Sequence, residues 1–225
     1  GRLFETFLTA TMRGEALGQF FTPRSVVKFI VKLAKLRATP KTTDLVLDGC
    51  CGTGGFLIEA MAEMSAAIAQ NRSLTLPEKE KHQRRLRLET LWGIDAGKDP
   101  QMARIARLNM LLHKDGGSRI YFADALDKQL RTERGIPSQT QLETDELRNE
   151  FRHKKTRFSC VLSNPPFSMT YERKKPTELA VLDDYTLAID EKGKPRSSLR
   201  SSVMFLERYW DLLTDDSSEL GAGRL

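Results

Sequence analysis

Residues 47–56 read LDGCCGTGGF and join an apolar run to a helical pattern. The apolar residues that precede the glycines are typical of a short buried strand, and residues 54–70, GGFLIEAMAEMSAAIAQ, have the apolar spacing of a helix. Gly52, Gly54 and Gly55 allow the backbone to turn tightly and to approach a ligand without a Cβ, and the helix start offers free N–H groups. The stretch predicts a strand, a turn suited to a nucleotide-like cofactor, and a helix, although a glycine-rich connection without a ligand has the same pattern.

Three further apolar segments of strand length follow along the chain. They are residues 90–95 (TLWGID), 119–126 (RIYFADAL) and 158–163 (FSCVLS). Because these short strands alternate with helical patterns, the sequence predicts an α/β fold, a doubly wound and mostly parallel sheet with helices on both faces. In such sheets ligands bind beyond the carboxyl ends of the strands, where the unusual residues of this chain fall. Helices are expected over residues 22–34, 54–70, 99–112 and 201–213.

Polar segments interrupt this alternation. Residues 71–90 lack strand signals and predict a helical insertion or a loop at the surface, whereas residues 127–157 are expected to be partly helical. Residues 168–200 are rich in Lys, Pro and Ser, which predicts a long mobile loop. The final residues, ELGAGRL, resemble the turn into another strand, so we expect the domain to be truncated before its last strands.

The chain of 225 residues has a formal net charge of +6 and a pI near 9.3. Its basic residues gather in three segments with few apolar residues, at 79–87, 148–157 and 172–175. Such a balance permits a polyanionic partner. Charge alone does not decide between a nucleic-acid surface and ordinary solvated helix faces and loops.

The three cysteines, Cys50, Cys51 and Cys160, are an odd number and two of them are adjacent. This pattern fits neither a disulfide framework nor zinc-ligand spacing, so we expect reduced thiols and no metal. The sequence contains no apolar run of 18 residues, and its first residues lack the pattern of a signal peptide. These observations favour a cytoplasmic protein with no membrane partner.

Asn164, Pro165, Pro166 and Phe167 end the last predicted strand. Proline has no N–H donor and a fixed φ, so the carbonyls of Asn164 and Pro165 are stiffly placed acceptors. Together with the Asn164 amide, such a carbonyl can hold both hydrogens of an exocyclic NH2 group, and Phe167 can stack on a planar base. The alternative is a simple strand terminator, but the coincidence of four such residue types with a strand end favours a binding site.

Acidic residues end two other predicted strands. Asp95 follows the second strand, where an acidic residue can bind both hydroxyls of a ribose; alternatively, Asp95 or Asp99 caps the next helix. Asp124 follows the third strand and can accept a hydrogen bond from an adenine amino group, or it is an ordinary turn aspartate. Each position therefore has a ligand-binding and a structural interpretation.

These residues resemble a known family. DGCCGTGGF, GIDA, ADAL and NPPF resemble motifs I to IV of amino-directed, S-adenosylmethionine-dependent DNA methyltransferases, although motif II usually carries Glu where this chain has Asp95. GQFFTPRSVVKFIV (18–31) resembles motif X and precedes motif I, which is the γ order. Taken together over about residues 14–225, the chain looks most like the modification subunit of type I restriction-modification systems.

The resemblance implies a Rossmann-like catalytic domain over residues 1–225 that transfers a methyl group from S-adenosylmethionine to N6 of adenine in DNA. It implies double-stranded DNA and separate specificity and restriction subunits as partners, and residues 1–17 as a lead-in helix from a further N-terminal domain. The implied catalytic residues are Asn164, Pro165, Pro166 and Phe167. The implied cofactor-binding residues are Gln19, Phe20, Phe21, Thr22, Pro23, Arg24, Asp48, Gly49, Cys50, Gly52, Thr53, Gly54, Gly55, Phe56, Asp95, Asp124 and Ala125.

Two alternatives remain beside this interpretation. A methyltransferase of RNA or of protein glutamine would share the glycine-rich turn and the NPP-aromatic pattern, but those families lack an upstream GQFFTP. A non-catalytic fragment that serves in DNA binding or assembly would not need an intact site, and Asn164, Asp48 and Gly52 are all present. Both observations favour a DNA methyltransferase.

Overall fold

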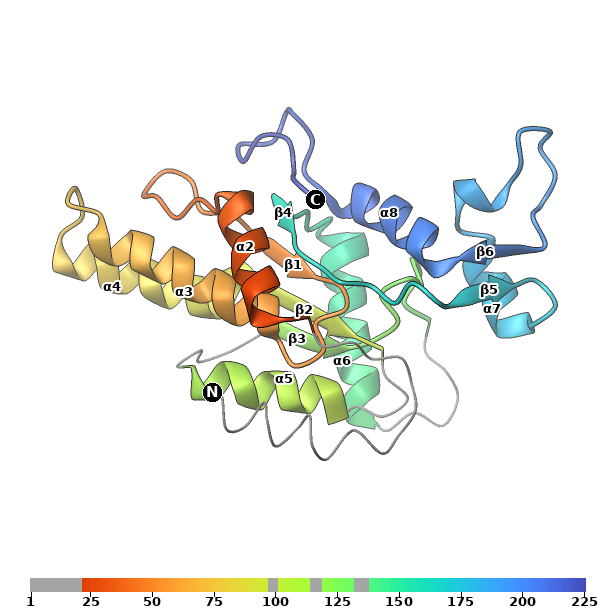
Figure 1. The fold of residues 1–225 in the computed structure, drawn as a ribbon, viewed down its shortest axis with the longest axis horizontal. Helices are drawn as coiled ribbons and strands as arrows, with labels where there is room; N and C mark the ends of the chain where they lie inside the picture. The colour runs from red at the N-terminus through yellow and green to blue at the C-terminus, as the bar shows by residue number, and fades with distance from the viewer. Residues whose placement is uncertain (1–21, 97–100, 114–118, 132–137) are drawn as a thin grey trace.

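The computed structural model describes residues 22–96, 101–113, 119–131 and 138–225. At its centre is a parallel sheet whose strands lie in the order β3-β2-β1-β4 (Figure 1). The strands are β1 (Val46–Asp48), β2 (Leu91–Asp95), β3 (Arg119–Phe122) and β4 (Cys160–Val161). The predicted parallel α/β sheet is therefore confirmed, with shorter strands than the apolar runs suggested.

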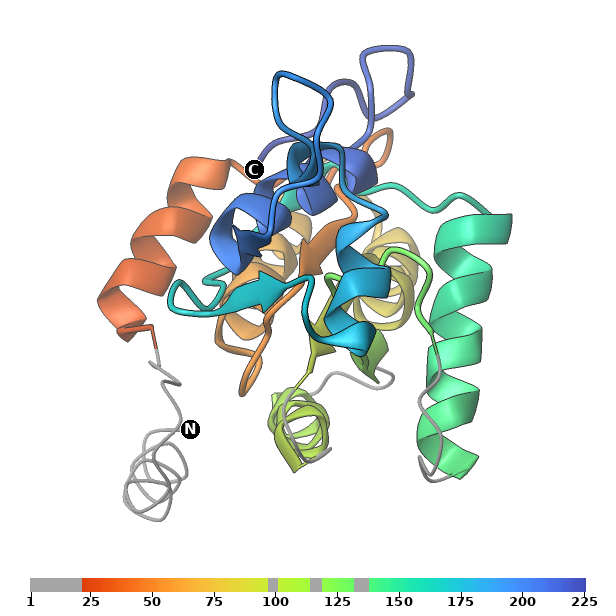
Figure 2. The same cartoon turned by 90° about the vertical axis from the view of Figure 1, so that its right-hand side faces the viewer.

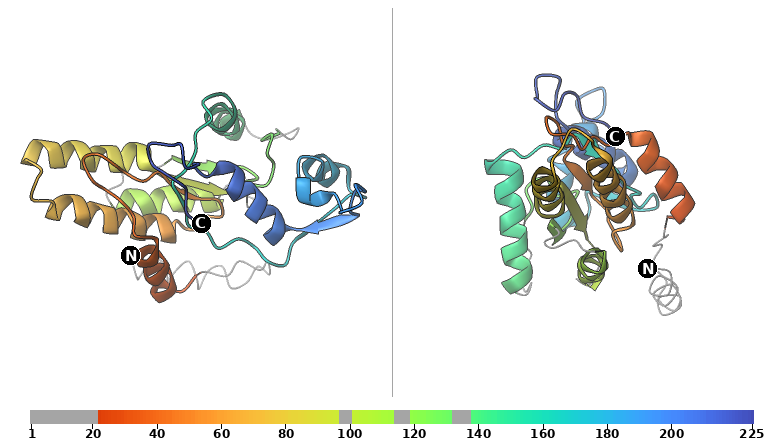
Figure 3. Two further views of the ribbon diagram at one scale, coloured as in Figure 1. Left: turned by 90° about the horizontal axis from the view of Figure 1, so that it is seen from above. Right: turned by 90° about the vertical axis from the view of Figure 1, so that its left-hand side faces the viewer.

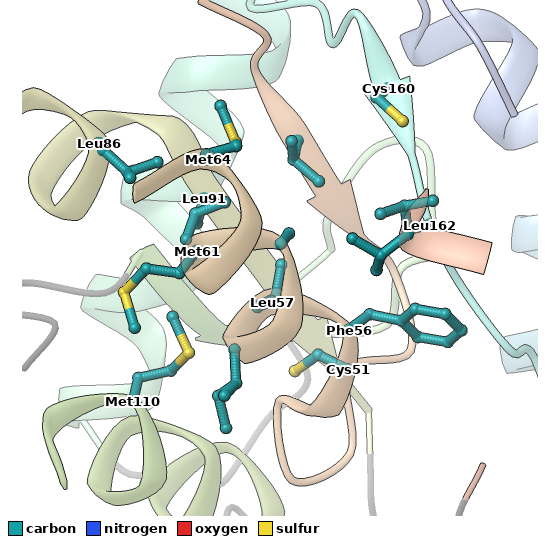
Figure 4. Close-up of a cluster of buried hydrophobic side chains, with 14 of the residues drawn as sticks. Cys51, Phe56, Leu57, Met61, Met64, Leu86, Leu91, Met110, Cys160 and Leu162 are labelled. Atoms are coloured by element: carbon teal, nitrogen blue, oxygen red, sulfur yellow. The ribbon is translucent and has the colours of Figure 1, made fainter. Parts of the chain in front are cut away.

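Successive residues of each strand point to opposite faces of the sheet, as the pleat requires. In β1, Val46 enters one buried cluster and Leu47 the other; in β2, Leu91 and Trp92 divide in the same way. Both faces are thus apolar and both need a cover of helices. Figure 4 shows part of the first cluster, where the helix that follows β1 packs on the sheet.

Helices cover both faces, as predicted. The first cluster includes residues of α2 (Arg24–Ala34), α3 (Gly55–Gln70) and α5 (Gln101–Leu112). The second includes residues of α6 (Ser138–Arg148) and α8 (Ser201–Leu212). Figure 2 shows α2 and α6 on opposite sides of the molecule. Within the described ranges, no helix has both the length and the apolar character of a membrane span.

The strand order explains where a ligand site can form. From β1 the chain proceeds to β2 and then to β3 on one side of the sheet, whereas β4 pairs with the other side of β1. The strand order thus reverses between β1 and β4, and ligands of open α/β sheets bind at such a switch point. The loops after β1 and β4, which carry the glycine-rich turn and Asn164, meet there.

The insertion at residues 71–90 is helical, as one of the two expectations had it. It contains α4 (Leu76–Arg85) and a π-helical turn, η2 (Leu86–Thr90). Thr75 and Glu78 form a capping box, in which the Thr75 N–H donates to Glu78 Oε2 at 2.7 Å. This reciprocal cap satisfies free donors of the first turn and explains why so polar a segment begins a helix.

Residues 170–200, where the sequence predicts a loop, contain two strands and two short helices. These elements are β5 (Thr170–Glu172), α7 (Pro176–Leu182), η4 (Thr186–Ala188) and β6 (Ser198–Arg200), and β5 pairs antiparallel with β6. We call these residues the β5–β6 module. Its buried residues are Tyr171, Val181, Leu182, Tyr185 and Ala188. They lie far apart in a polar sequence, so no periodic pattern indicated them.

The last residues of the chain return to the sheet. Gly221 has a φ of +70°, which favours glycine, and turns the chain toward the free edge of β4. There Arg224 N donates to Ser159 O at 3.0 Å and accepts, at its carbonyl, the N–H of Val161 at 2.8 Å. The turn predicted from the terminal glycines thus leads to backbone that pairs in parallel with β4. The expected lead-in helix (1–17), Gln19–Phe21 and Asp99 lie outside the described residues.

Candidate active site

The glycine-rich turn after β1 is held by the end of β2. Cys51 N donates to Ile94 O at 2.9 Å, and Gly52 N donates to Asp95 Oδ2 at 2.9 Å. Gly52 and Gly54 have φ values of +50° and +83°, which side chains rarely adopt. Apart from neighbouring backbone, no atom of the described residues lies within 4 Å of the position that a Cβ would take at Gly52 or at Gly55. At these two glycines the described residues therefore leave the backbone of the turn uncovered.

Asp48 lies beneath this turn, at the end of β1, with 1% of its surface exposed. Its Oδ1 accepts hydrogen bonds from Cys50 N at 3.1 Å and from Ser163 Oγ at 3.0 Å. Burial disfavours the charged form and raises the pKa of Asp48 to about 7, despite these two donors. A cationic group of a ligand would restore the charge, so this carboxyl is suited to bind one.

The raised pKa of Asp48 predicts a pH-dependent stability. The folded-state pKa, about 7, exceeds the ordinary value of 3.8. The protonated carboxyl therefore makes its full contribution to the free energy of unfolding below the ordinary pKa. This contribution is lost as the pH rises toward and through 7. Urea titrations of the wild type and of Asp48→Asn on either side of that pH should show the wild type losing stability relative to the variant as the pH rises. Parallel profiles for the two proteins would contradict the shift.

Tyr209 of α8 joins the ends of β1 and β4. Its hydroxyl donates to Ser163 Oγ at 2.8 Å, and its side chain is buried. A Cβ at Gly49 would lie 2.6 Å from the tyrosine ring and hydroxyl, so only glycine fits beside it. The hydrogen bonds from Tyr209 to Ser163 and from Ser163 to Asp48 were not predicted from the sequence. A tyrosine in an apolar helix pattern gives no local sign that its hydroxyl contacts a functional site.

The Asn164 turn after β4 is fixed from both sides. Asn164 Nδ2 donates to Thr22 Oγ1 at 3.0 Å, and Ser201 Oγ, fully buried at the start of α8, donates to Pro166 O at 2.7 Å. With Nδ2 engaged, the amide oxygen of Asn164 is oriented as an acceptor, and no donor among the described residues reaches it. Phe167 has 67% of its surface exposed, whereas the aromatic residues of the core are buried. The turn thus presents fixed acceptors beside an open ring.

Asp95 and Asp124 occupy the predicted strand ends, and both make structural contacts. Asp95 holds Gly52 N, as described above. Asp124 Oδ1 accepts from Leu126 N and its Oδ2 accepts from Tyr171 Oη, each at 2.9 Å. Burial raises the pKa of Asp124. Asp124 therefore holds the turn after β3 and contacts the β5–β6 module, a contact that the sequence did not indicate.

Other predicted residues divide into turn backbone and core. Thr53 O accepts from Asn109 Nδ2 of α5 at 2.9 Å, which ties that helix to the glycine-rich turn. Phe56 is buried in the first cluster, and Ala125 is buried in the second. Cys50 Sγ lies 3.9 Å from the Tyr209 hydroxyl. The remaining predicted residues with described positions, Pro23 and Arg24, lie at the start of α2.

Comparison with known proteins identifies the family. The family model for N-6 DNA methylases matches residues 1–195. A methylase subunit of the type I restriction enzyme EcoEI from Escherichia coli is 25% identical over 92% of the chain. The type II restriction enzyme and methyltransferase RM.BcgI from Heyndrickxia coagulans is 34% identical over 48% of it. The chain spans only 37% and 14% of these two relatives.

Solved structures agree on the fold. A modification subunit assigned to a type I restriction enzyme of Vibrio vulnificus YJ016 superimposes with a TM-score of 0.67 and 24% identity, over 99% of this chain and 37% of that one. The M protein of the type I restriction enzyme EcoKI gives a TM-score of 0.53 and 20% identity, over 93% of this chain and 34% of that one. With its sheet, its glycine-rich turn and its NPPF turn at the switch point, the chain belongs to the N-6 DNA methylase family.

Proposed function

We propose that the chain is the catalytic part of a type I modification methyltransferase that methylates N6 of adenine in double-stranded DNA, with S-adenosylmethionine as methyl donor. The observation that carries the proposal is the contact between Asn164 and Thr22 beside the turn that Asp48 supports. This contact brings together the segment that resembles motif X, which contains Thr22, and the segment that resembles motif IV, which contains Asn164. We also propose the cytoplasm as its location.

The residues present fit S-adenosylmethionine. The open space over Gly52 and Gly55 accepts a ligand against bare backbone, and the buried carboxyl of Asp48 suits the ammonium group of the methionine moiety. In this proposal Asp95 would hold the ribose and Asp124 the adenine. When bound, the cofactor supplies an electrophilic methyl group on a sulfonium. The chain's own part is to hold that group close to Asn164.

The chemistry asked of Asn164 is hydrogen-bond acceptance. An adenine amino nitrogen is a poor nucleophile because its lone pair is delocalised into the ring, and a neutral amide is no base. The Asn164 amide oxygen and the Pro165 carbonyl would accept the two amino hydrogens and so favour a pyramidal nitrogen whose lone pair is available. These bonds strengthen as positive charge develops, which stabilises the transition state more than the ground state.

The target base would have to leave the duplex to reach these acceptors. The exposed ring of Phe167 offers a surface on which a flipped base can stack. An in-line methyl transfer then needs the glycine-rich turn and the Asn164 turn on adjacent strands, which the pairing of β1 with β4 provides. The specificity and restriction subunits are proposed partners by analogy with the type I relatives.

A comparison of methyl acceptors tests this proposal. The complete enzyme would be incubated with labelled S-adenosylmethionine and, separately, with duplex DNA, RNA and cellular protein. Label in DNA alone is expected. Label in RNA or in protein would favour the methyltransferases of those substrates, and no label in any acceptor would favour a non-catalytic assembly module.

Replacing Asp95 with alanine should weaken cofactor binding about tenfold or more, because the variant cannot form a hydrogen bond in which a charged carboxylate takes part. The substitution also releases Gly52 N, which Asp95 holds in the glycine-rich turn. Calorimetric titration of S-adenosylmethionine measures the change. Glu80→Ala, an exposed carboxylate on α4, is the matched control and should bind normally. Unchanged affinity of the Asp95 variant would remove the proposed role.

A further inference from the structure

The β5–β6 module lies at the end of the sheet where the candidate active site is found. β5 begins three residues after Phe167, and β6 ends directly before Ser201, which holds Pro166. Ser201 N also donates to Met169 O at 2.9 Å. The module therefore enters and leaves the fold beside the Asn164 turn.

The module is anchored to the loop that follows β3. Tyr185 Oη donates to Leu126 O at 2.6 Å, and an ion pair of 2.9 Å joins Arg131 to Asp184. Tyr171 Oη adds its bond to Asp124. A segment held at several points can present its outer side chains in fixed positions near the site.

The carboxylates of the module are largely engaged within it. Asp183 pairs with Arg173 at 2.5 Å, Glu178 pairs with Lys175 at 2.9 Å, and Asp190 accepts backbone N–H groups of the turn at 2.8 and 2.9 Å. Four cations toward its end have no carboxylate within 4 Å among the described residues, and all four are exposed. They are Lys192, Lys194, Arg196 and Arg200.

The basic segments 79–87 and 148–157 face elsewhere. They precede β2 and β4, so in a parallel sheet they lie at the edge opposite the candidate active site. Figures 1 and 3 show α4 and the β5–β6 module at opposite ends of the molecule. Several of their cations also serve the fold: Lys79 Nζ donates to Ala69 O, and Lys154 pairs with Glu150, both at 2.7 Å.

We infer that Lys192, Lys194, Arg196 and Arg200 form the surface that binds the backbone phosphates of DNA beside the target base. This inference rests on the proposed function and adds to it the place where the duplex is held. Exposed, unpaired lysines and arginines bind phosphates by releasing counterions, and such contacts position a protein on DNA without reading its sequence. Arg200 directly precedes Ser201, which holds the Asn164 turn through Pro166. Lys192, Lys194 and Arg196 lie in the part of the module that leads to β6.

The test compares two variants with equal changes in charge. The first carries Lys192→Gln, Lys194→Gln, Arg196→Gln and Arg200→Gln. The second carries Arg72→Gln, Lys81→Gln, Arg84→Gln and Arg152→Gln. These residues are exposed, lie in segments that precede β2 and β4, and have no carboxylate partner among the described residues. Both are prepared in the complete enzyme, and the affinity for a fluorescein-labelled DNA duplex is measured against salt concentration.

The first variant should bind DNA more weakly, and its plot of log K against log salt should flatten by about 0.9 for each phosphate that the protein no longer neutralises. Its calorimetric affinity for S-adenosylmethionine should equal that of the wild type. The second variant should keep the wild-type salt dependence. The inference would be overturned if the first variant had the same slope as the wild type, or if the second variant had an equally flattened slope. DNA methylation by the wild type would still support the proposed function in either case. A wild type that methylates no DNA would overturn both.

Discussion

Asn164→Ala is expected to lower the rate of methyl transfer by roughly 10²-fold or more, the cost seen when one preorganised contact to a developing charge is removed. The amide would contact the amino group and not the cofactor, so affinity for S-adenosylmethionine should stay near the wild-type value. Single-turnover rates with labelled cofactor, beside calorimetric titration, separate these two effects.

Thr22→Val is the informative companion to this variant. It removes the hydroxyl that accepts from Asn164 Nδ2 at 3.0 Å but keeps the amide and the shape of the side chain. A smaller loss of rate than in Asn164→Ala is expected, because the acceptor remains but is less well oriented. Wild-type turnover in Asn164→Ala would contradict the role given to the amide.

Asp44→Ala is expected to lower the free energy of unfolding by about 3–5 kcal/mol, the usual cost of removing one partner of a buried charge pair. Asp44 is fully buried, and its Oδ1 accepts from Arg37 Nη2 at 2.6 Å and from Ser159 Oγ at 2.8 Å. Its Oδ2 pairs with Arg224. The substitution leaves two guanidinium groups without their shared carboxylate.

Urea titration measures this change, with the exposed Asp216→Ala as a control that should differ by less than about 0.5 kcal/mol. Burial raises the pKa of Asp44, but the hydrogen bonds from Arg37, Ser159 and Arg224 outweigh it and the pKa is lowered from 3.8. The contribution of Asp44 is therefore present above that pH and is lost as the pH falls below it. A loss of stability similar to that of the control would show that the pair is not needed for stability.

The sequence predicted the parts of the fold whose signals are local. Each strand of the central sheet lies in an apolar run. The glycine turn of residues 52–55 and the NPPF turn of residues 164–167 are indicated by their own residue types. The same holds for α3, whose bounds, Gly55–Gln70, differ by one residue from the helix expected over 54–70. Local patterns also placed Asp48, Asp95 and Asp124 at strand ends, which a parallel sheet brings to one edge.

Contacts between residues far apart in the chain could not be predicted from local sequence patterns. Tyr209 fits against Gly49, a residue far away in the chain, and no pattern in either segment refers to the other. The β5–β6 module buries a few residues scattered through a polar segment, so its folding depends on the loop after β3. For the same reason, the basic segments 79–87 and 172–175 look alike in sequence but lie at opposite ends of the structure (Figure 1).

The central claim is that Asn164 and its turn serve methyl transfer to N6 of adenine in DNA. The most direct test is to identify the labelled base after reaction of the complete enzyme with labelled S-adenosylmethionine and duplex DNA, by hydrolysis and chromatography. The account predicts label in N6-methyladenine with the wild type and a strongly reduced amount with Asn164→Ala. Label in N4-methylcytosine, or equal N6-methyladenine from both proteins, would contradict it.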